Sequence, residues 1–164
     1  MVKDMDINEE MDINNKIQII ETKAQPVLSI KTVTPVENLP QVLGKAYESI
    51  FNYIKENEEN PTDAPFTAYY NMDMENLEVE VGFPVANELA GKDEIVAGQI
   101  PAGRKVVSLY YGAYKDIGQA YEAMMKWISE NGFQPTGVVY EFYYNSPMEV
   151  PEEELMTRIM FLLK

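Results

Sequence analysis

The sequence predicts an α+β fold built from two β-α-β-β units. Three observations point to this class: one stretch occurs twice, apolar residues fall at helical spacing in two places, and alternating β-branched segments flank both. AYESIFNYIKEN, from Ala46, returns as AYEAMMKWISEN, from Ala120, which is a shift of 74 positions. Because the chain of 164 residues has the length of one domain, we expect both units to share one fold.

The same shift of 74 positions aligns residues well outside the helix. The residues that recur are Gly44, Ala46, Tyr47, Glu48, Ile54, Glu56, Asn57, Pro61, Thr62, Tyr69, Tyr70 and Asn71. A unit this small cannot bury its own apolar face, so two copies should pack about a pseudo-twofold axis. The predicted domain therefore covers 17–164, with repeat one at about 17–90 and repeat two at about 91–164.

Each unit is predicted as a strand, a helix and a hairpin. In repeat one, IQIIETKAQPVLSIKTVTP gives one long strand or a strand broken at Pro26, and a helix runs from near Pro40 to Asn57. PFTAYYNMD and LEVEVGFPV form its hairpin. In repeat two, the strand ends in VVSLYYG, the helix spans about Asp116 to Asn131, and VVYEFYYN and ELMTRIMFLL form the second hairpin.

The composition excludes several kinds of chemistry. With neither Cys nor His, the chain offers no thiol nucleophile, no catalytic triad with histidine and no thiolate or imidazole metal site. The net charge of -14 repels phosphates, so direct binding of DNA is not expected, whereas cationic or neutral partners are favoured. Neither a membrane span nor a secretory signal is present, which predicts a cytoplasmic protein.

The first sixteen residues, MVKDMDINEEMDINNK, are predicted to form an acidic flexible tail. DMDIN looks like the start of a calcium loop. However, the sixth position is Glu9 where glycine is needed, and the twelfth is Asn15 where a bidentate Glu is expected. We therefore predict no metal site and no cofactor.

A groove on the pseudo-twofold axis is the expected place for a ligand, since such a ligand would touch both halves. In VVYEFYYN, Glu141 shares one face with Val139 and Tyr143, and its counterpart in repeat one is Thr67. The carboxylate thus belongs to one half only. A buried carboxylate needs a partner, which could be a ligand. The alternative is that Glu141 lies solvated at an edge or on the outer face.

Aromatic residues and methionines are the other candidates for ligand contact. Tyr47 and Tyr121 lie on the apolar stripe of each helix and are predicted as core. Tyr110 and Tyr114 bracket Gly112 at a strand-to-helix junction, where either a groove or a core position is open. Trp127 offers a face for a cation, although core packing is the favoured alternative there. Met125 offers an adaptable surface, which gap-filling in the core explains equally well.

The order of motifs resembles the gyrase-inhibitor-like small-molecule-binding domain, which is also the effector-binding module of AraC-type and MerR-type regulators. The motifs are EVGFPV at Glu80, IPAGR at Ile100, YGAY at Tyr111, WISENG at the end of the second helix, VYEFYYNSP at Val139 and the closing ELMTRI. The resemblance implies a curved antiparallel sheet with two main helices and a central groove. It also implies a stand-alone form, without the helix-turn-helix of the regulators.

In that family the groove binds lipophilic, often cationic, aromatic compounds, and an acidic residue faces the ligand's charge. By motif position this acid is Glu141. One departure is Arg158, which stands where the last strand commonly has an acid. The predicted ligand-binding residues are Glu141, Tyr114, Trp127, Tyr110, Tyr143, Tyr69, Phe83 and Met125.

Three functions follow from the resemblance. The first is binding of lipophilic aromatic, cationic compounds for sequestration or sensing. The second is hydrolysis of cyclopropane-bearing alkylating compounds, with Glu141 as general base and Tyr114 as acid or hydrogen-bond donor. The third is an acidic protein that interacts with a protein partner such as gyrase or a regulator, through the tail or EVPEEE at Glu149. We rank small-molecule binding first.

Overall fold

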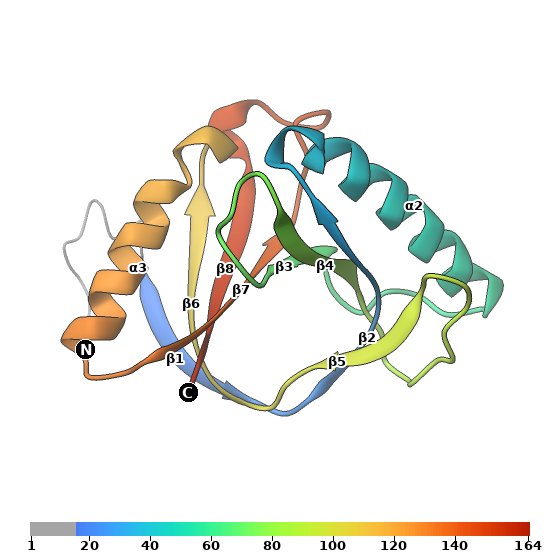
Figure 1. Cartoon of the computed structure of the whole chain (residues 1–164), viewed down its shortest axis with the longest axis horizontal. Coiled ribbons are helices and arrows are strands. Elements are labelled where there is room, and N and C mark those ends of the chain that lie inside the picture. The colour runs from blue at the N-terminus through green and yellow to red at the C-terminus, as the bar shows by residue number, and fades with distance from the viewer. Residues whose placement is uncertain (1–15) are drawn as a thin grey trace.

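The computed structural model describes residues 16–164 and contains one sheet flanked by two helices (Figure 1). The helices are α2 (Leu39–Glu56) and α3 (Gly118–Glu130). Within residues 16–164, no helix is both long and apolar enough to cross a membrane. The predicted acidic tail, including the rejected calcium loop, lies outside the described residues apart from Lys16.

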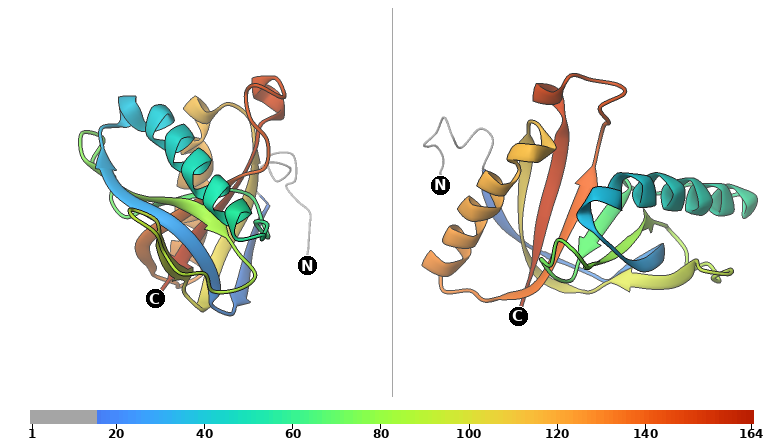
Figure 2. Two further views of the ribbon diagram at one scale, coloured as in Figure 1. Left: turned by 90° about the vertical axis from the view of Figure 1, so that its right-hand side faces the viewer. Right: turned by 45° about the horizontal axis from the view of Figure 1, so that its top comes forward.

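The sheet has eight strands in the order β1-β6-β8-β7-β3-β4-β2-β5, and the neighbouring strands are antiparallel. It curls into a half-barrel, with α3 over one half and α2 over the other (Figures 1 and 2). The predicted α+β class and curved antiparallel sheet are therefore confirmed. The strands are β1 (Ile17–Thr22), β2 (Gln25–Thr34), β3 (Phe66–Tyr69), β4 (Leu77–Pro84), β5 (Val96–Ile100), β6 (Gly103–Tyr111), β7 (Pro135–Tyr143) and β8 (Met156–Leu163).

The strand order is symmetric about the central pair β7 and β3. One half consists of β2, α2, β3 and β4, and the other consists of β6, α3, β7 and β8. In the chain, the outer strand β1 precedes the first half and the outer strand β5 precedes the second. The outer strands exchange partners: β1 pairs with β6, and β5 pairs with β2. Two copies of one unit would give this order, although the pseudo-twofold repeat itself stays a prediction.

One prediction about the strands was wrong, and one strand was missed. The break in the first strand falls at Lys23 and Ala24, whereas Pro26 is the second residue of β2, where a missing N–H is tolerated. Strand β5 was not predicted at all. Ala97 and Gly98 give it little β propensity, and β2 supplies its pairing.

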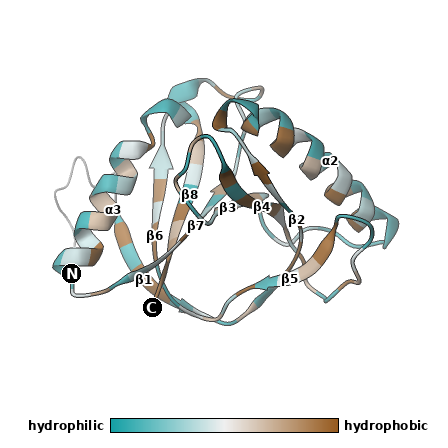
Figure 3. Ribbon diagram, in the orientation of Figure 1, coloured by the Kyte–Doolittle hydropathy of each residue, from teal (hydrophilic) through white to brown (hydrophobic). Residues whose placement is uncertain are grey.

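The two faces of the sheet bury different cores. On one, the helix face, Ala46, Ile50 and Ile54 of α2 and Ala120, Met124 and Ile128 of α3 are buried against the strands. On the other, the inner face, all buried members of the cluster come from strands, including Phe66, Tyr140 and Met160. This cluster closes because the curl brings opposite strands together. Figure 3 shows hydrophobic colouring on β3 and β4, which lie near the centre of the sheet.

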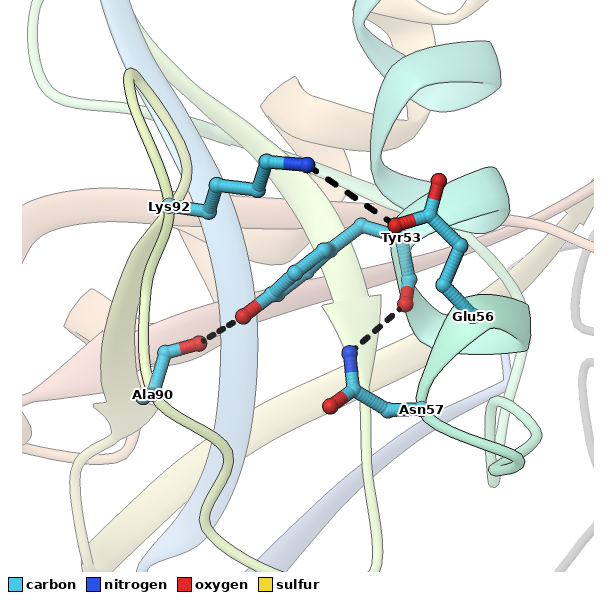
Figure 4. Close-up of polar contacts among 5 residues, drawn as sticks. All are labelled: Tyr53, Glu56, Asn57, Ala90 and Lys92. Carbon is cyan, nitrogen blue, oxygen red and sulfur yellow. Dashed lines mark hydrogen bonds and ion pairs between the residues drawn. The ribbon is translucent and has the colours of Figure 1, made fainter.

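The loop between β4 and β5 is fastened to the end of α2 (Figure 4). The Tyr53 hydroxyl donates to the carbonyl of Ala90 over 2.8 Å, and the Lys92 ammonium lies 5.8 Å from the centre of the Tyr53 ring. Lys92 also lies 3.8 Å from a carboxylate oxygen of Glu56. Because this ion pair is exposed, it contributes little, and the tyrosine holds the loop.

A buried ammonium holds the turn between β5 and β6. The Lys105 Nζ donates to Thr22 Oγ1 and the carbonyl of Pro101, both over 2.7 Å, and to the carbonyl of Gly103 over 3.1 Å. Burial lowers the pKa of Lys105, while nearby Glu21 acts in the opposite direction. All three donors of the ammonium are thus satisfied, which is what allows a charged group inside this turn.

Candidate functional site

The centre of the sheet brings Glu141 of β7 directly opposite Thr67 of β3, on the helix face. Glu141 is only 8% exposed, so it is not a solvated edge residue. Its carboxylate accepts two phenol hydrogen bonds, from Tyr121 on α3 over 2.5 Å and from Tyr143 on β7 over 2.7 Å. We call Glu141, Tyr121, Tyr143, Tyr69, Tyr47 and Thr67 the central cluster.

The electrostatics of Glu141 are those of a charge taken out of water. Burial raises the pKa of Glu141 above its usual value, and the hydrogen bonds from Tyr121 and Tyr143 oppose this only in part. Burial also raises the pKa of both tyrosines, with the Glu141 charge as the next cause, so both remain donors. Within residues 16–164, no cationic side chain forms an ion pair with Glu141.

The other half of the central cluster is uncharged. The Tyr47 hydroxyl lies 3.0 Å from Thr67 Oγ1 and donates to the carbonyl of Phe66 over 3.0 Å. Tyr47 thus faces Thr67 as Tyr121 faces Glu141. The hydroxyls of Tyr69 and Tyr143 lie 3.4 Å apart across the β3–β7 seam and link the two halves.

Tyr114 lies beside this cluster rather than on the carboxylate. It is 40% exposed, and its ring packs edge-on against Tyr143 with 6.0 Å between centroids. Burial, and then the Glu141 charge, raise its pKa. The hydroxyls that bond Glu141 come from Tyr121 and Tyr143, so a catalytic pair of Glu141 and Tyr114 is not preformed.

The remaining predicted residues lie elsewhere. Trp127 stacks on Phe133, with ring centroids 6.3 Å apart; being six positions after Tyr121, it points about 120° away around the helix. Tyr110 donates to the carbonyl of Ala113 over 2.7 Å and supports the turn at Gly112, whose φ is 145°.

Phe83 packs against Tyr47 and Phe51 under α2. Met125 is 50% exposed on α3. Thus, of the eight predicted residues, the central cluster contains Glu141, Tyr143 and Tyr69, and Tyr114 contacts it.

Sequence reasoning missed three members of the cluster. Tyr47 and Tyr121 were predicted as core. Their rings do pack there, but their hydroxyls reach the β3–β7 seam. Thr67 was noted only as the neutral counterpart of Glu141. The sequence did contain a signal for them, because each helix has a tyrosine at the same position of the repeat. A buried tyrosine hydroxyl needs a partner, and Thr67 or Glu141 is the polar residue of the same half that could provide one.

A surface pocket of the described residues lies away from Glu141. It has a volume of about 500 Å³ and lies between the end of β6, the start of α3 and the acidic turn before β8. Its lining includes Tyr110, Gln119, Glu152 and Glu153. The predicted central groove therefore stays a prediction, and a ligand at Glu141 would have to displace the tyrosines that cover it.

The inner face carries a second buried carboxylate. Glu80 is 5% exposed and accepts hydrogen bonds from Ser29 over 2.6 Å and Tyr70 over 2.7 Å. Arg158, the noted departure from the family pattern, also lies on this face, 5.6 Å from the centre of the Phe142 ring. Arg158 and Glu141 are therefore on opposite faces of the sheet.

Comparisons with known structures show the same fold. In the EcmrR–DNA complex, the EcmrR chain superposes with a TM-score of 0.77 and 22% identity, covering 90% of this chain. This chain spans only 57% of that regulator's length. The isolated EcmrR C-terminal domain gives a TM-score of 0.73 at 19% identity, covering 90% of this chain and 96% of that one.

A third structure, SAV2435 bound to tetraphenylphosphonium, gives a TM-score of 0.60 at 13% identity and covers 90% of this chain and 93% of that one. A search of curated proteins found no match. The model of the GyrI-like small molecule binding domain matches residues 15–164, which include all of the described residues. The chain therefore belongs to the GyrI-like family of small-molecule-binding domains.

Proposed function

We propose that the chain binds lipophilic aromatic cations, with Glu141 as the countercharge. The observation that carries the proposal is a buried carboxylate that is held by tyrosine hydroxyls and paired with no cation of residues 16–164. A carboxylate has about four acceptor positions, of which the two hydroxyls use two. A ligand that displaces the covering tyrosines would find the remaining positions, and the charge itself, available.

The surroundings suit an aromatic cation. The hydroxyls of Tyr121 and Tyr143 bond the carboxylate, and the Tyr114 ring packs against Tyr143. An aromatic face is worth about 0.5–2 kcal/mol to a cation that contacts it. The structural neighbour SAV2435 is bound to tetraphenylphosphonium, a compound of this class. The hydrolase and gyrase alternatives rest on the family resemblance alone.

The test compares a cation with a neutral molecule of similar shape. We expect Glu141→Gln to weaken binding of tetraphenylphosphonium by tenfold or more, because the substitution removes the countercharge while it keeps the side-chain shape and one of the two acceptor oxygens. Binding of neutral triphenylphosphine oxide should be almost unchanged. Isothermal titration calorimetry measures both.

The matched control is Glu130→Gln, which changes the net charge equally at an exposed position of α3. It should leave both affinities unchanged. If Glu141→Gln weakens the cation and the neutral compound equally, the carboxylate is not a countercharge and the proposal is wrong.

A further inference from the structure

Two buried hydroxyls on the helix face, Thr157 Oγ1 and Ser108 Oγ, have no hydrogen-bond partner among residues 16–164. Thr157 is 0% exposed and Ser108 is 3% exposed. A buried hydroxyl without a partner is costly, and native structures contain few of them. These two therefore require an explanation that the hydrogen bonds of the fold do not give.

Both hydroxyls lie next to the central cluster. Thr157 of β8 is directly opposite Tyr143 of β7, which makes it a diagonal neighbour of Glu141. Ser108 of β6 is opposite Ile159, whose other partner is Glu141. Alternation along the strands puts all of these side chains on the face that α3 covers.

The equivalent positions in the other half are apolar. Tyr69 is opposite Val79, as Tyr143 is opposite Thr157. A second comparison follows one row of paired residues across three strands. In the half with Glu141, the row is Glu141, Ile159 and Ser108. In the other half, the equivalent row is Thr67, Val81 and Ile30. Val79 and Ile30 pack under α2 in an ordinary apolar cluster. The half that carries Glu141 has therefore gained two hydroxyls that packing alone does not need.

We propose that Thr157 and Ser108 extend the Glu141 site and select cations that carry N–H donors, such as a primary ammonium or an amidinium on an aromatic scaffold. The inference rests on the proposed function. A group with several donors can bond the carboxylate and the Thr157 hydroxyl on the neighbouring strand at once, whereas Ser108, two strands from Glu141, would take a donor at the far end of the same site. A quaternary cation lacks donors, so it would leave the hydroxyls buried without a partner.

The experiment uses two probes of equal charge on one scaffold, 1-naphthylmethylammonium and its N,N,N-trimethyl analogue, in which methyl groups replace all the N–H donors. We expect the protein to bind the primary ammonium more tightly. Thr157→Val, which keeps the side-chain shape, should lower that affinity about five- to tenfold and leave the trimethyl affinity unchanged. Ser108→Ala should act in the same direction. Calorimetry gives all the affinities.

The melting temperature of Thr157→Val and a control variant separate the loss of a ligand contact from a loss of stability. Because it removes a buried hydroxyl without a partner, Thr157→Val should raise the Tm of the free protein while it weakens the ammonium. Thr62→Val, at an exposed position, should change neither quantity. Glu141→Gln should weaken both cations.

The outcomes distinguish the two proposals. If the protein binds both cations and Thr157→Val and Ser108→Ala change neither affinity, the donor selection is wrong and the cation site stands. Equal weakening of both cations by Thr157→Val also overturns the selection. If the protein binds neither cation, the proposed function fails together with this inference.

Discussion

Glu141 is a residue that the fold tolerates rather than needs. Two tyrosine hydroxyls bond it, yet burial still raises its pKa, so the desolvation of the charge exceeds what the hydroxyls return. A group of this kind costs stability in the free protein. Sites that bind ligands commonly carry such a cost.

The pH dependence of stability follows from that shift. The folded pKa lies above the usual 4.5, so the folded protein holds the Glu141 proton more tightly than the unfolded chain does. The contribution of this carboxyl is therefore most favourable below about pH 4.5 and is lost as the pH rises through the folded pKa. We expect Glu141→Gln to escape this loss.

Urea denaturation between pH 5 and pH 8 tests the prediction. The free energy of unfolding of Glu141→Gln relative to the original protein should rise with pH and favour the variant by roughly 1–3 kcal/mol at the upper end. Glu130→Gln should show no such trend. A variant that is less stable than the original at every pH would mean that the tyrosines stabilise the charged form overall.

At the scale of the elements, a glycine sets how closely the strands β2 and β4 approach. Gly82 is opposite Ser29, and a Cβ on Gly82 would overlap the carbonyl oxygen of Leu28 and lie 2.9 Å from the Ser29 Cα. Ser29 also donates to Glu80 from this position. The contact between backbones therefore leaves no room for a side chain.

We expect Gly82→Ala to destabilise the protein by about 1–3 kcal/mol, because β2 and β4 must separate. The matched control is Gly44→Ala in α2, where nothing lies within 4 Å of the added carbon. That change should stabilise the helix by about 0.5–1 kcal/mol. Thermal unfolding should thus shift in opposite directions, and a Gly82→Ala protein with an unchanged Tm would contradict the packing.

At the scale of the molecule, the two halves are interlocked. The outer strands β1 and β5 pair with the opposite half, so neither half can complete its sheet alone. The central β3–β7 pair joins the halves a third time. We therefore expect one cooperative unfolding transition for the whole described domain.

Tryptophan fluorescence can follow each half separately. Trp127 is the only tryptophan and reports on the half with α3, while a Phe51→Trp, Trp127→Phe variant places the probe on α2. In urea, each probe should give the midpoint that far-UV circular dichroism gives for the same protein. A fluorescence midpoint that differs from the circular dichroism midpoint of the same protein would show that the halves unfold independently.

The sequence predicted the parts of the fold that local patterns encode. Both helices and both hairpins follow from periodicity, and the position of Glu141 follows from alternation along β7. The exchange of β1 and β5 was missed, because pairing between halves leaves no local pattern. So was the break at Lys23, which lacks the turn residues that mark such a place.

The site was predictable only in part for a related reason. Sequence patterns say which face a residue occupies, and they do not say where the end of a long side chain reaches. Tyr121 therefore read as core although its hydroxyl bonds Glu141. Thr157 and Ser108 gain significance only when the register shows their apolar counterparts.

Within residues 16–164 the sheet does not close into a barrel, and the strands β1 and β5 each have a sheet neighbour on one side only. An open strand edge can accept a strand from another copy of the same protein. At neutral pH the net charge of -14 keeps copies apart. Near the isoelectric point of about 4.3 that repulsion disappears. Lowering the pH, rather than raising the temperature, is therefore the condition that would promote edge-to-edge association of the protein.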